Sequence, residues 1–151
     1  MTRVLFVCLG NICRSPMAHG IFAEAVARRG LTDRFAVDSA GTASYHQGER
    51  PDPRTMDVLA THGIALDTTS RQVTRDDFDD FDLILAMDRS NHRNLLAVCP
   101  AVHAHKVRMM LEPVGGGEVG DPYYGGAAGF EVNYRQLTEA SERWLDELTE
   151  A

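Results

Sequence analysis

The chain has 151 residues, of which 44% are hydrophobic and 25% charged, and its formal net charge is −7 at pH 7. This length and composition fit one globular domain over residues 1–151. The acidic balance argues against nucleic-acid and anionic-membrane partners, because the body of the protein would repel both. The three cysteines are too few for a disulfide framework, and no apolar run suits a signal peptide or a membrane span. We therefore expect a cytoplasmic protein, with export without a signal peptide left open.

The first predicted elements are a strand, a loop and a helix that follow one another directly. Val4–Val7 is rich in strand-forming residues. A stretch with apolar side chains at helical spacing begins at Pro16, with Ser15 as the expected N-cap and Gly30 as the stop. Phe35–Ala40 is predicted to be a second strand, parallel to the first. The loop after the first strand therefore lies where open α/β sheets bind ligands.

That loop, Cys8–Ser15 (the Cys8 loop), combines an oxyanion site with a nucleophile. A helix start offers unpaired backbone N–H groups and a positive dipole end, which attract anions. Gly10 and Asn11 tolerate the turns that aim such N–H groups into one concavity. Arg14 adds a fork of donors that matches phosphate oxygens. Positive surroundings favour the thiolate form of a cysteine, so Cys8 is a candidate nucleophile.

The rest of the chain continues the alternation of helices and buried strands. This alternation predicts a single α/β domain of the flavodoxin-like type, a four-stranded parallel sheet with helices on both faces. The further predicted elements are a helix over Pro53–His62, a short helix over Thr74–Phe78, a strand over Leu83–Met87, a helix from Asp88 to Ala97, a strand over Val107–Leu111 and a last helix over about Phe130–Leu148.

A second segment with chemical character is Asp121–Gly125, the Asp121 loop. Pro122 restricts the backbone next to Asp121 and can hold its carboxylate at a set angle. Tyr123 and Tyr124 are paired aromatics on a loop, which form a binding surface more often than a core. An ordinary β-turn is the simpler interpretation of Asp-Pro by itself. The presence of the Cys8 loop in the same chain favours the functional interpretation.

Together, the Cys-x5-Arg-Ser string and the Asp-Pro-Tyr-Tyr-Gly string resemble the low-molecular-weight protein tyrosine phosphatase family. The resemblance implies that Cys8 attacks phosphorus, that Arg14 and the loop amides hold the phosphate oxygens, and that Asp121 protonates the leaving tyrosyl oxygen. A phosphocysteine intermediate follows, and water then hydrolyses it. No metal or cofactor is expected. The other segments that carry the resemblance are Ser39–Thr42, Arg71–Thr74 and Ala86–Asp88.

The same resemblance implies a substrate cleft with aromatic walls. Its expected occupant is a phosphotyrosine side chain of a protein, with inorganic phosphate as a product, and the expected oligomeric state is a monomer or weak dimer. Within the cleft, reversible oxidation is expected between Cys8 and Cys13. The candidate substrate-binding residues are Leu9, Gly10, Asn11, Ile12, Cys13, Ser15, Tyr45, Tyr123 and Tyr124.

Three other functions can be weighed against this one. Protein arginine phosphatases share the Cys-x5-Arg loop but tend to have threonine at the position of Ile12 and a single aromatic at Tyr123–Tyr124. Thioredoxin-coupled arsenate reductases need relay thiols after the third strand, where this chain offers only Cys99 and has Ala86 at the first relay position. A non-catalytic phosphotyrosine-binding module would need neither the nucleophile nor the acid. Tyrosine phosphatase is therefore the favoured function, with arginine phosphatase as the main alternative.

One position departs from the family pattern. Family members often have a histidine shortly before the Arg-Gln-Val-Thr segment, bonded to the loop asparagine, whereas this chain has Asp67–Ser70 there. We expect a hydroxyl from that stretch to bond Asn11 instead.

Overall fold

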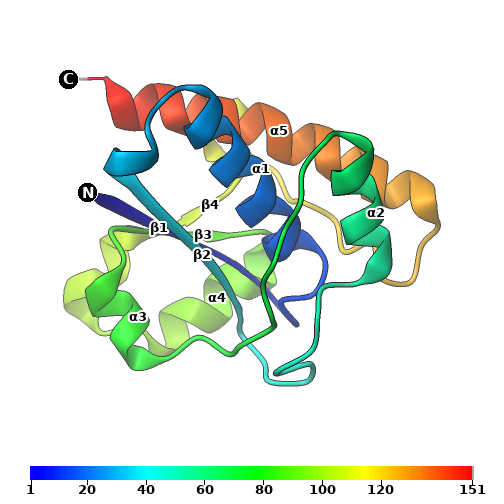
Figure 1. Ribbon diagram of the computed structural model, residues 1–151. Helices are drawn as coiled ribbons and strands as arrows, with labels where there is room; N and C mark the ends of the chain where they lie inside the picture. Colours follow the sequence, from blue (N-terminus) through cyan, green and yellow to red (C-terminus); the bar gives the residue numbers. More distant parts are fainter. Residues whose placement is uncertain (151) are drawn as a thin grey trace.

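The sheet is built around its first strand. In the computed structural model, which describes residues 1–150, β1 (Thr2–Cys8) pairs in parallel with β2 (Phe35–Gly41) on one side and with β3 (Leu83–Ala86) on the other. A fourth parallel strand, β4 (Val107–Met109), pairs with β3, so the order is β2-β1-β3-β4. The predicted four-stranded parallel sheet is therefore confirmed (Figure 1).

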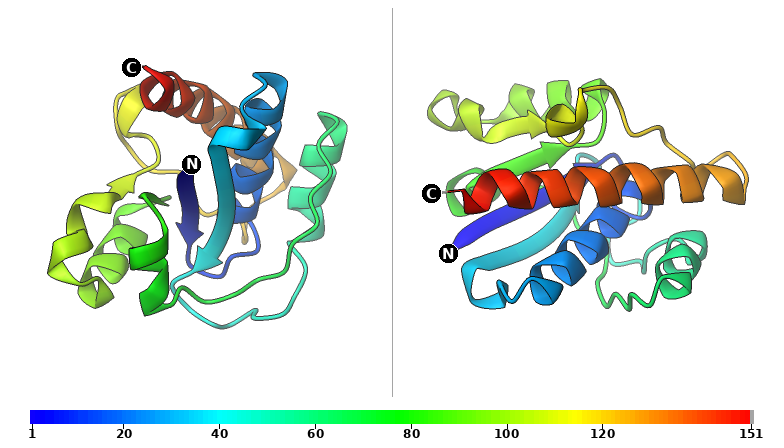
Figure 2. Two further views of the ribbon diagram at one scale, coloured as in Figure 1. Left: turned by 60° about the vertical axis from the view of Figure 1, so that its left-hand side comes forward. Right: turned by 90° about the horizontal axis from the view of Figure 1, so that it is seen from above.

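Helices cover both faces of this sheet (Figures 1 and 2). Side chains of α1, α2 and α5 share one hydrophobic core with the sheet, while α3 and α4 contribute to a second core on the opposite face. None of the helices within residues 1–150 is long and apolar enough to cross a membrane. The helices are α1 (Arg14–Arg28), α2 (Pro53–Thr61), α3 (Arg75–Asp80), α4 (Arg89–Val98) and α5 (Ala127–Thr149), and 3-10 turns lie at Thr32–Arg34, Ala101–Lys106 and Glu112–Val114.

The alternation of side chains along β1 explains why the sheet needs helices on both faces. Val4 and Phe6 point into the core under α1 and α5, and Leu5 and Val7 point into the core under α3 and α4. All four side chains are fully buried. Cys8 is the last residue of this strand. Its side chain therefore lies at the carboxyl edge of the sheet, among the loops that follow the strands.

Two helix starts differ from those expected. The first helix begins at Arg14, with Cys13 as an N-cap that makes no side-chain capping bond, so the prediction of Ser15 as the N-cap is wrong. The hydroxyl of Ser15 instead faces Cys8. The last helix begins at Ala127, about one turn before Phe130.

Candidate active site

The Cys8 loop joins β1 to α1 through a tightly constrained backbone. Asn11 has φ 56°, a left-handed conformation that side chains other than glycine adopt infrequently. Gly10 is required for a different reason, since a Cβ at this position would lie 2.9 Å from the imidazole of His46. Gly41 is also confined, because a Cβ there would lie 2.7 Å from the carbonyl oxygen of Leu9. The small-residue turn at the end of β2 thus packs directly against the Cys8 loop.

Cys8 lies at the centre of a short hydrogen-bond network. The Oγ of Ser15 is 3.1 Å from the Sγ of Cys8. The Nδ2 of Asn11 donates to the same Oγ at 2.8 Å, and this bond leaves the hydroxyl proton of Ser15 free to point at the sulfur. Cys8, Asn11 and Ser15 are all buried. A hydroxyl that donates to Cys8 stabilises a thiolate at this position.

The remaining partner of Asn11 differs from the one expected. The backbone N–H of Arg71 donates to the Oδ1 of Asn11 at 3.1 Å. The prediction of a hydroxyl partner is therefore wrong, because the Ser70 hydroxyl donates to the carbonyl of Gly10 at 2.8 Å instead. The missing family histidine is replaced by a main-chain donor.

The backbone of Arg71 is itself held in place. Its guanidinium pairs with Asp38 on β2 at 3.0 Å and with Asp77 on α3 at 2.9 Å. Asp77 is buried and also accepts a hydrogen bond from the backbone N–H of Thr74, which completes a capping box at the start of α3. The position of Asn11 is thus determined from both β2 and α3.

Arg14 is buried at the start of α1 and is surrounded by acceptors. Its Nη1 donates to Asp88 at 2.6 Å and to the carbonyl of Val119 at 2.9 Å, and its Nη2 lies 3.8 Å from the Oδ2 of Asp121. Burial by itself would lower the pKa of Arg14, but the nearby Cys8 and Asp88 outweigh burial and raise it, so the guanidinium stays charged. The two N–H groups bonded to Asp88 and Val119 fix the plane of the guanidinium and leave its other edge towards Asp121.

Asp121 is oriented by its own loop. The backbone N–H of Tyr123 donates to its Oδ1 at 3.1 Å, an Asx-type turn that leaves Oδ2 facing Arg14. The Asp121 side chain is 44% exposed, so a proton can reach it from solvent. The carboxyl group therefore lies at the mouth of the site, opposite the Cys8 loop.

These segments enclose one cavity of about 170 Å³. Its mouth is aromatic: the rings of Tyr123 and Tyr124 meet edge to face with centroids 4.9 Å apart, and Tyr45 stands 75% exposed on the other side. Asn11 and Ser15 lie behind the lining rather than in it. The lining residues are Cys8, Leu9, Gly10, Ile12, Cys13, Arg14, Tyr45, His46, Asp121, Tyr123 and Tyr124.

Two residues of this site were missed in the sequence. Asp88 was expected to start a helix and lies in a segment that carries the family resemblance, but no role in the site was assigned to it. It caps α4 by accepting from the N–H of Asn91 at 2.7 Å, and its second oxygen binds Arg14. Its place directly after the strand next to β1 could have indicated this, since the carboxyl ends of parallel strands meet at one edge. His46 lines the cavity beside Gly10, and nothing in its spacing signals that place.

The arrangement suits a tetrahedral oxyanion bound to a sulfur nucleophile. A phosphate group at the floor would meet the N-terminal turn of α1, the guanidinium of Arg14 and the sulfur of Cys8. Among residues 1–150 there is no group of three or more histidine, cysteine or carboxylate side chains that could hold a metal ion. Arg14 and the N-terminal turn of α1 are the positively polarised groups that such an anion would meet.

Comparison with known proteins agrees with this geometry. A family model described as low molecular weight phosphotyrosine protein phosphatase matches residues 3–151. The chain is 48% identical to the low molecular weight phosphotyrosine protein phosphatase of Schizosaccharomyces pombe, over 95% of this chain and 94% of the relative.

Solved structures are similar over nearly the whole chain. A protein tyrosine phosphatase from Entamoeba histolytica, with Hepes in its active site, superposes with a TM-score of 0.95 at 40% identity, covering 98% of this chain and 97% of the other. A Drosophila arginine phosphatase superposes with a TM-score of 0.92 at 37% identity, covering 99% of each chain. The family match and these likenesses show that the chain belongs to the low molecular weight phosphotyrosine protein phosphatases, enzymes that work through a phosphocysteine intermediate.

Proposed function

We propose that Cys8, Arg14 and Asp121 carry out the two displacements of this phosphatase on protein phosphotyrosine. The observation that supports these roles is their convergence on one cavity from three distant parts of the chain. The sulfur lies at its floor, the guanidinium beside it and the carboxyl at its mouth. A substrate between them would have its phosphorus next to Cys8 and its leaving oxygen next to Asp121.

In the first displacement, the thiolate of Cys8 forms a bond to phosphorus while the bond to the tyrosyl oxygen breaks. Asp121 gives its proton to that oxygen, so a neutral tyrosine leaves. Arg14 and the amides of the Cys8 loop hold the three equatorial oxygens, where negative charge is spread in the transition state. Asp88 contributes indirectly, because its bond to Arg14 fixes the direction of the guanidinium.

In the second displacement, the carboxylate of Asp121 takes a proton from water as the water oxygen attacks phosphorus. The bond between sulfur and phosphorus breaks, and the thiolate of Cys8 leaves with inorganic phosphate as the other product. Ser15, 3.1 Å from the sulfur, donates to this leaving thiolate and makes it a better leaving group. The enzyme returns to its starting state with the proton back on Asp121.

We propose phosphotyrosine rather than phosphoarginine as the preferred group, because the cavity has apolar and aromatic walls. Ile12, Leu9 and the ring of Tyr123 offer apolar faces for a phenol ring. The overall fold cannot separate the two substrates, since both a tyrosine and an arginine phosphatase superpose closely on this chain. A slot deep enough for tyrosine would also keep the shorter phosphoserine from reaching Cys8.

Replacing Ile12 with threonine is expected to shift the ratio of kcat/KM towards phosphoarginine. Loss of apolar contact is worth about 0.8 kcal/mol per buried CH₂ group, roughly a 4-fold change. The measurement uses matched peptides that carry phosphotyrosine, phosphoarginine or phosphoserine, and Ile12→Val, which keeps an apolar wall, is the control. A wild-type preference for phosphoarginine or phosphoserine would contradict the proposed specificity.

We also propose that the cysteines of the loop make the enzyme reversibly sensitive to peroxide. Burial, together with the neighbouring carboxylate of Asp52, raises the pKa of the Cys13 thiol to about 12, so Cys13 is protonated at neutral pH. Peroxide is therefore expected to oxidise Cys8 first, to a sulfenic acid. Cys13 then displaces water from that sulfur and forms a disulfide, which thiol reductants reverse.

Peptide mapping after mild peroxide treatment tests this sequence of events. The expected result is a Cys8–Cys13 disulfide with full recovery of activity on reduction, and faster disulfide formation at higher pH as Cys13 deprotonates. In Cys13→Ser the same treatment should overoxidise Cys8 irreversibly. Overoxidised Cys8 beside a free Cys13 thiol in the wild-type protein would refute the protective role.

We further propose that the protein works in the cytoplasm as a monomer or weak dimer. The thiols of Cys8, Cys13 and Cys99 are all free in the described residues, which suits a reducing compartment. The acidic net charge of −7 also opposes strong self-association.

A further inference from the structure

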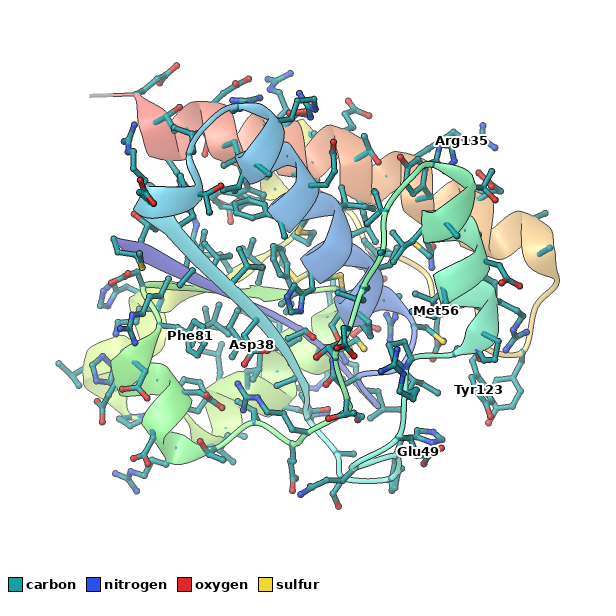
Figure 3. The ribbon with its side chains drawn as sticks, in the orientation of Figure 1. Asp38, Glu49, Met56, Phe81, Tyr123 and Arg135 are labelled. Carbon is teal, nitrogen blue, oxygen red and sulfur yellow. The ribbon has the colours of Figure 1, made fainter. Side chains whose placement is uncertain are left out.

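One arginine outside the cavity holds the backbone of the Asp121 loop. Arg54, in the first turn of α2, donates from Nη2 to the carbonyl of Tyr123 at 2.9 Å and from Nη1 to the carbonyl of Gly125 at 3.2 Å. Its guanidinium also lies over the rings of Tyr123 and Phe130, 5.6 and 4.6 Å from their centroids. Figure 3 shows Tyr123 beside the N-terminal end of α2, where this contact occurs.

The side chain of Arg54 is itself fixed by Asp52. The carboxylate of Asp52 accepts from the Nε of Arg54 at 3.0 Å, from its Nη2 at 2.9 Å and from its backbone N–H at 2.9 Å. The Asp52 side chain is only 8% exposed. A guanidinium held by its Nε and Nη2 offers its remaining donors in one direction, towards the Asp121 loop.

The same turn of α2 is bound to the Cys8 loop. The backbone N–H of Asp52 donates to the carbonyl of Ile12 at 2.8 Å, and the Oγ1 of Thr55 donates to the carbonyl of Cys13 at 3.3 Å. The start of α2 therefore touches both halves of the site. It bonds the loop that carries the nucleophile on one side and the loop that carries the acid on the other.

The Asp121 loop has few other attachments. Its approach is anchored at Val119, whose N–H donates to the carbonyl of Met87, and Pro122 is buried. Gly115–Gly117, three glycines with positive φ, precede that anchor. Across residues 1–150, no side chain from outside the loop other than that of Arg54 donates to the backbone of the Asp121 loop.

We propose that Arg54 is a positioning residue for Asp121, and that with Asp52 it sets the placement of the general acid relative to Cys8. This inference rests on the proposed role of Asp121. Arg54 does not line the catalytic cavity, so it acts through the loop and not on the substrate. Without it, the carbonyls of Tyr123 and Gly125 turn to solvent, and the loop carries Asp121 away from its productive position for part of the time.

The test compares Arg54→Met, Arg54→Lys, Asp121→Asn and the double variant Arg54→Met/Asp121→Asn on aryl phosphates with leaving groups of graded pKa. A displaced catalytic group commonly costs roughly 10- to 100-fold in rate. We expect Arg54→Met to lower kcat/KM, which reports formation of the phosphocysteine, by that factor for poor leaving groups and far less for activated ones. Arg54→Lys keeps a cation but lacks the forked guanidinium, so its kcat/KM should lie between those of the wild-type enzyme and Arg54→Met. Arg135→Met, at an exposed position of α5 outside the site, should match wild type.

The double variant separates positioning from a general structural role. If Arg54 acts only through Asp121, its replacement adds almost no loss once Asp121 is asparagine. Equal slowing of all aryl phosphates by Arg54→Met and Arg54→Lys, or full additivity in the double variant, would overturn the inference. If Asp121→Asn by itself does not steepen the leaving-group dependence, the proposed role of Asp121 fails, and that of Arg54 with it. If Asp121→Asn does and the Arg54 variants do not, only the inference about Arg54 is wrong.

Discussion

Replacing Cys8 with serine is expected to abolish turnover while phosphate binding stays largely intact. A serine hydroxyl is not ionised near neutral pH, so the variant has no nucleophile to form the covalent intermediate. The anion site depends instead on Arg14 and the loop amides, which the substitution leaves in place. Steady-state phosphatase activity measured beside the affinity for inorganic phosphate tests both halves of this expectation.

Cys99→Ser is the matched control for this experiment. Cys99 is half-buried at the end of α4, where its thiol donates to the carbonyl of Pro100 at 3.3 Å, and it takes no part in the cavity. We expect this variant to keep wild-type activity. Substantial turnover by Cys8→Ser would rule out Cys8 as the nucleophile, and loss of phosphate binding in the same variant would show that the thiol is part of the anion site.

Replacing Asp121 with asparagine is expected to slow hydrolysis most for leaving groups of high pKa. A tyrosyl oxygen that leaves without a proton is a poor leaving group, whereas an activated aryl oxide needs little help. General acid catalysis is typically worth ~10²–10⁴ in rate, which bounds the expected loss in kcat/KM, the quantity that reports departure of the leaving group. A series of aryl phosphates with leaving groups of graded pKa gives this dependence.

Asp57→Asn provides the same change of side chain at an exposed position of α2 that faces solvent. Its kinetics should match those of the wild-type enzyme for every leaving group. If Asp121→Asn lowers kcat/KM, which reports formation of the phosphocysteine, by one factor for all aryl phosphates, the carboxyl group acts by charge or by structure and is not the proton donor.

The fold could be predicted from the sequence because its signals are local. Strand-forming runs such as Val4–Val7, the apolar spacing of the helices and their alternation along the chain were enough to predict a parallel sheet covered on both faces. The Cys8 loop could also be predicted from the sequence, because its residues are consecutive and their chemistry is complementary. The family assignment drawn from these strings is confirmed by the family match over residues 3–151.

The parts of the site that sequence reasoning missed depend on contacts between distant residues. Asp88 reaches Arg14 across 74 positions, and Arg71 supports Asn11 across 60. The support for Asn11 is a backbone N–H, which every residue except proline has, so no residue type signals it. The error at Ser15 has a related cause. Its hydroxyl has the chemistry of an N-cap, but the fold places it beside Cys8, where it binds sulfur and Asn11 instead.

The central position of β1 means that Cys8 and Asp121 lie on segments of different local stability. A strand bonded on both sides and buried on both faces opens only when the whole domain unfolds, and amide hydrogen exchange in such strands reports global stability. Cys8 ends that strand. Asp121 belongs to a segment between glycines whose opening costs much less. Local opening of the Asp121 loop therefore displaces the proposed proton donor in the folded enzyme, whereas the position of Cys8 at the end of β1 changes only when the whole domain unfolds.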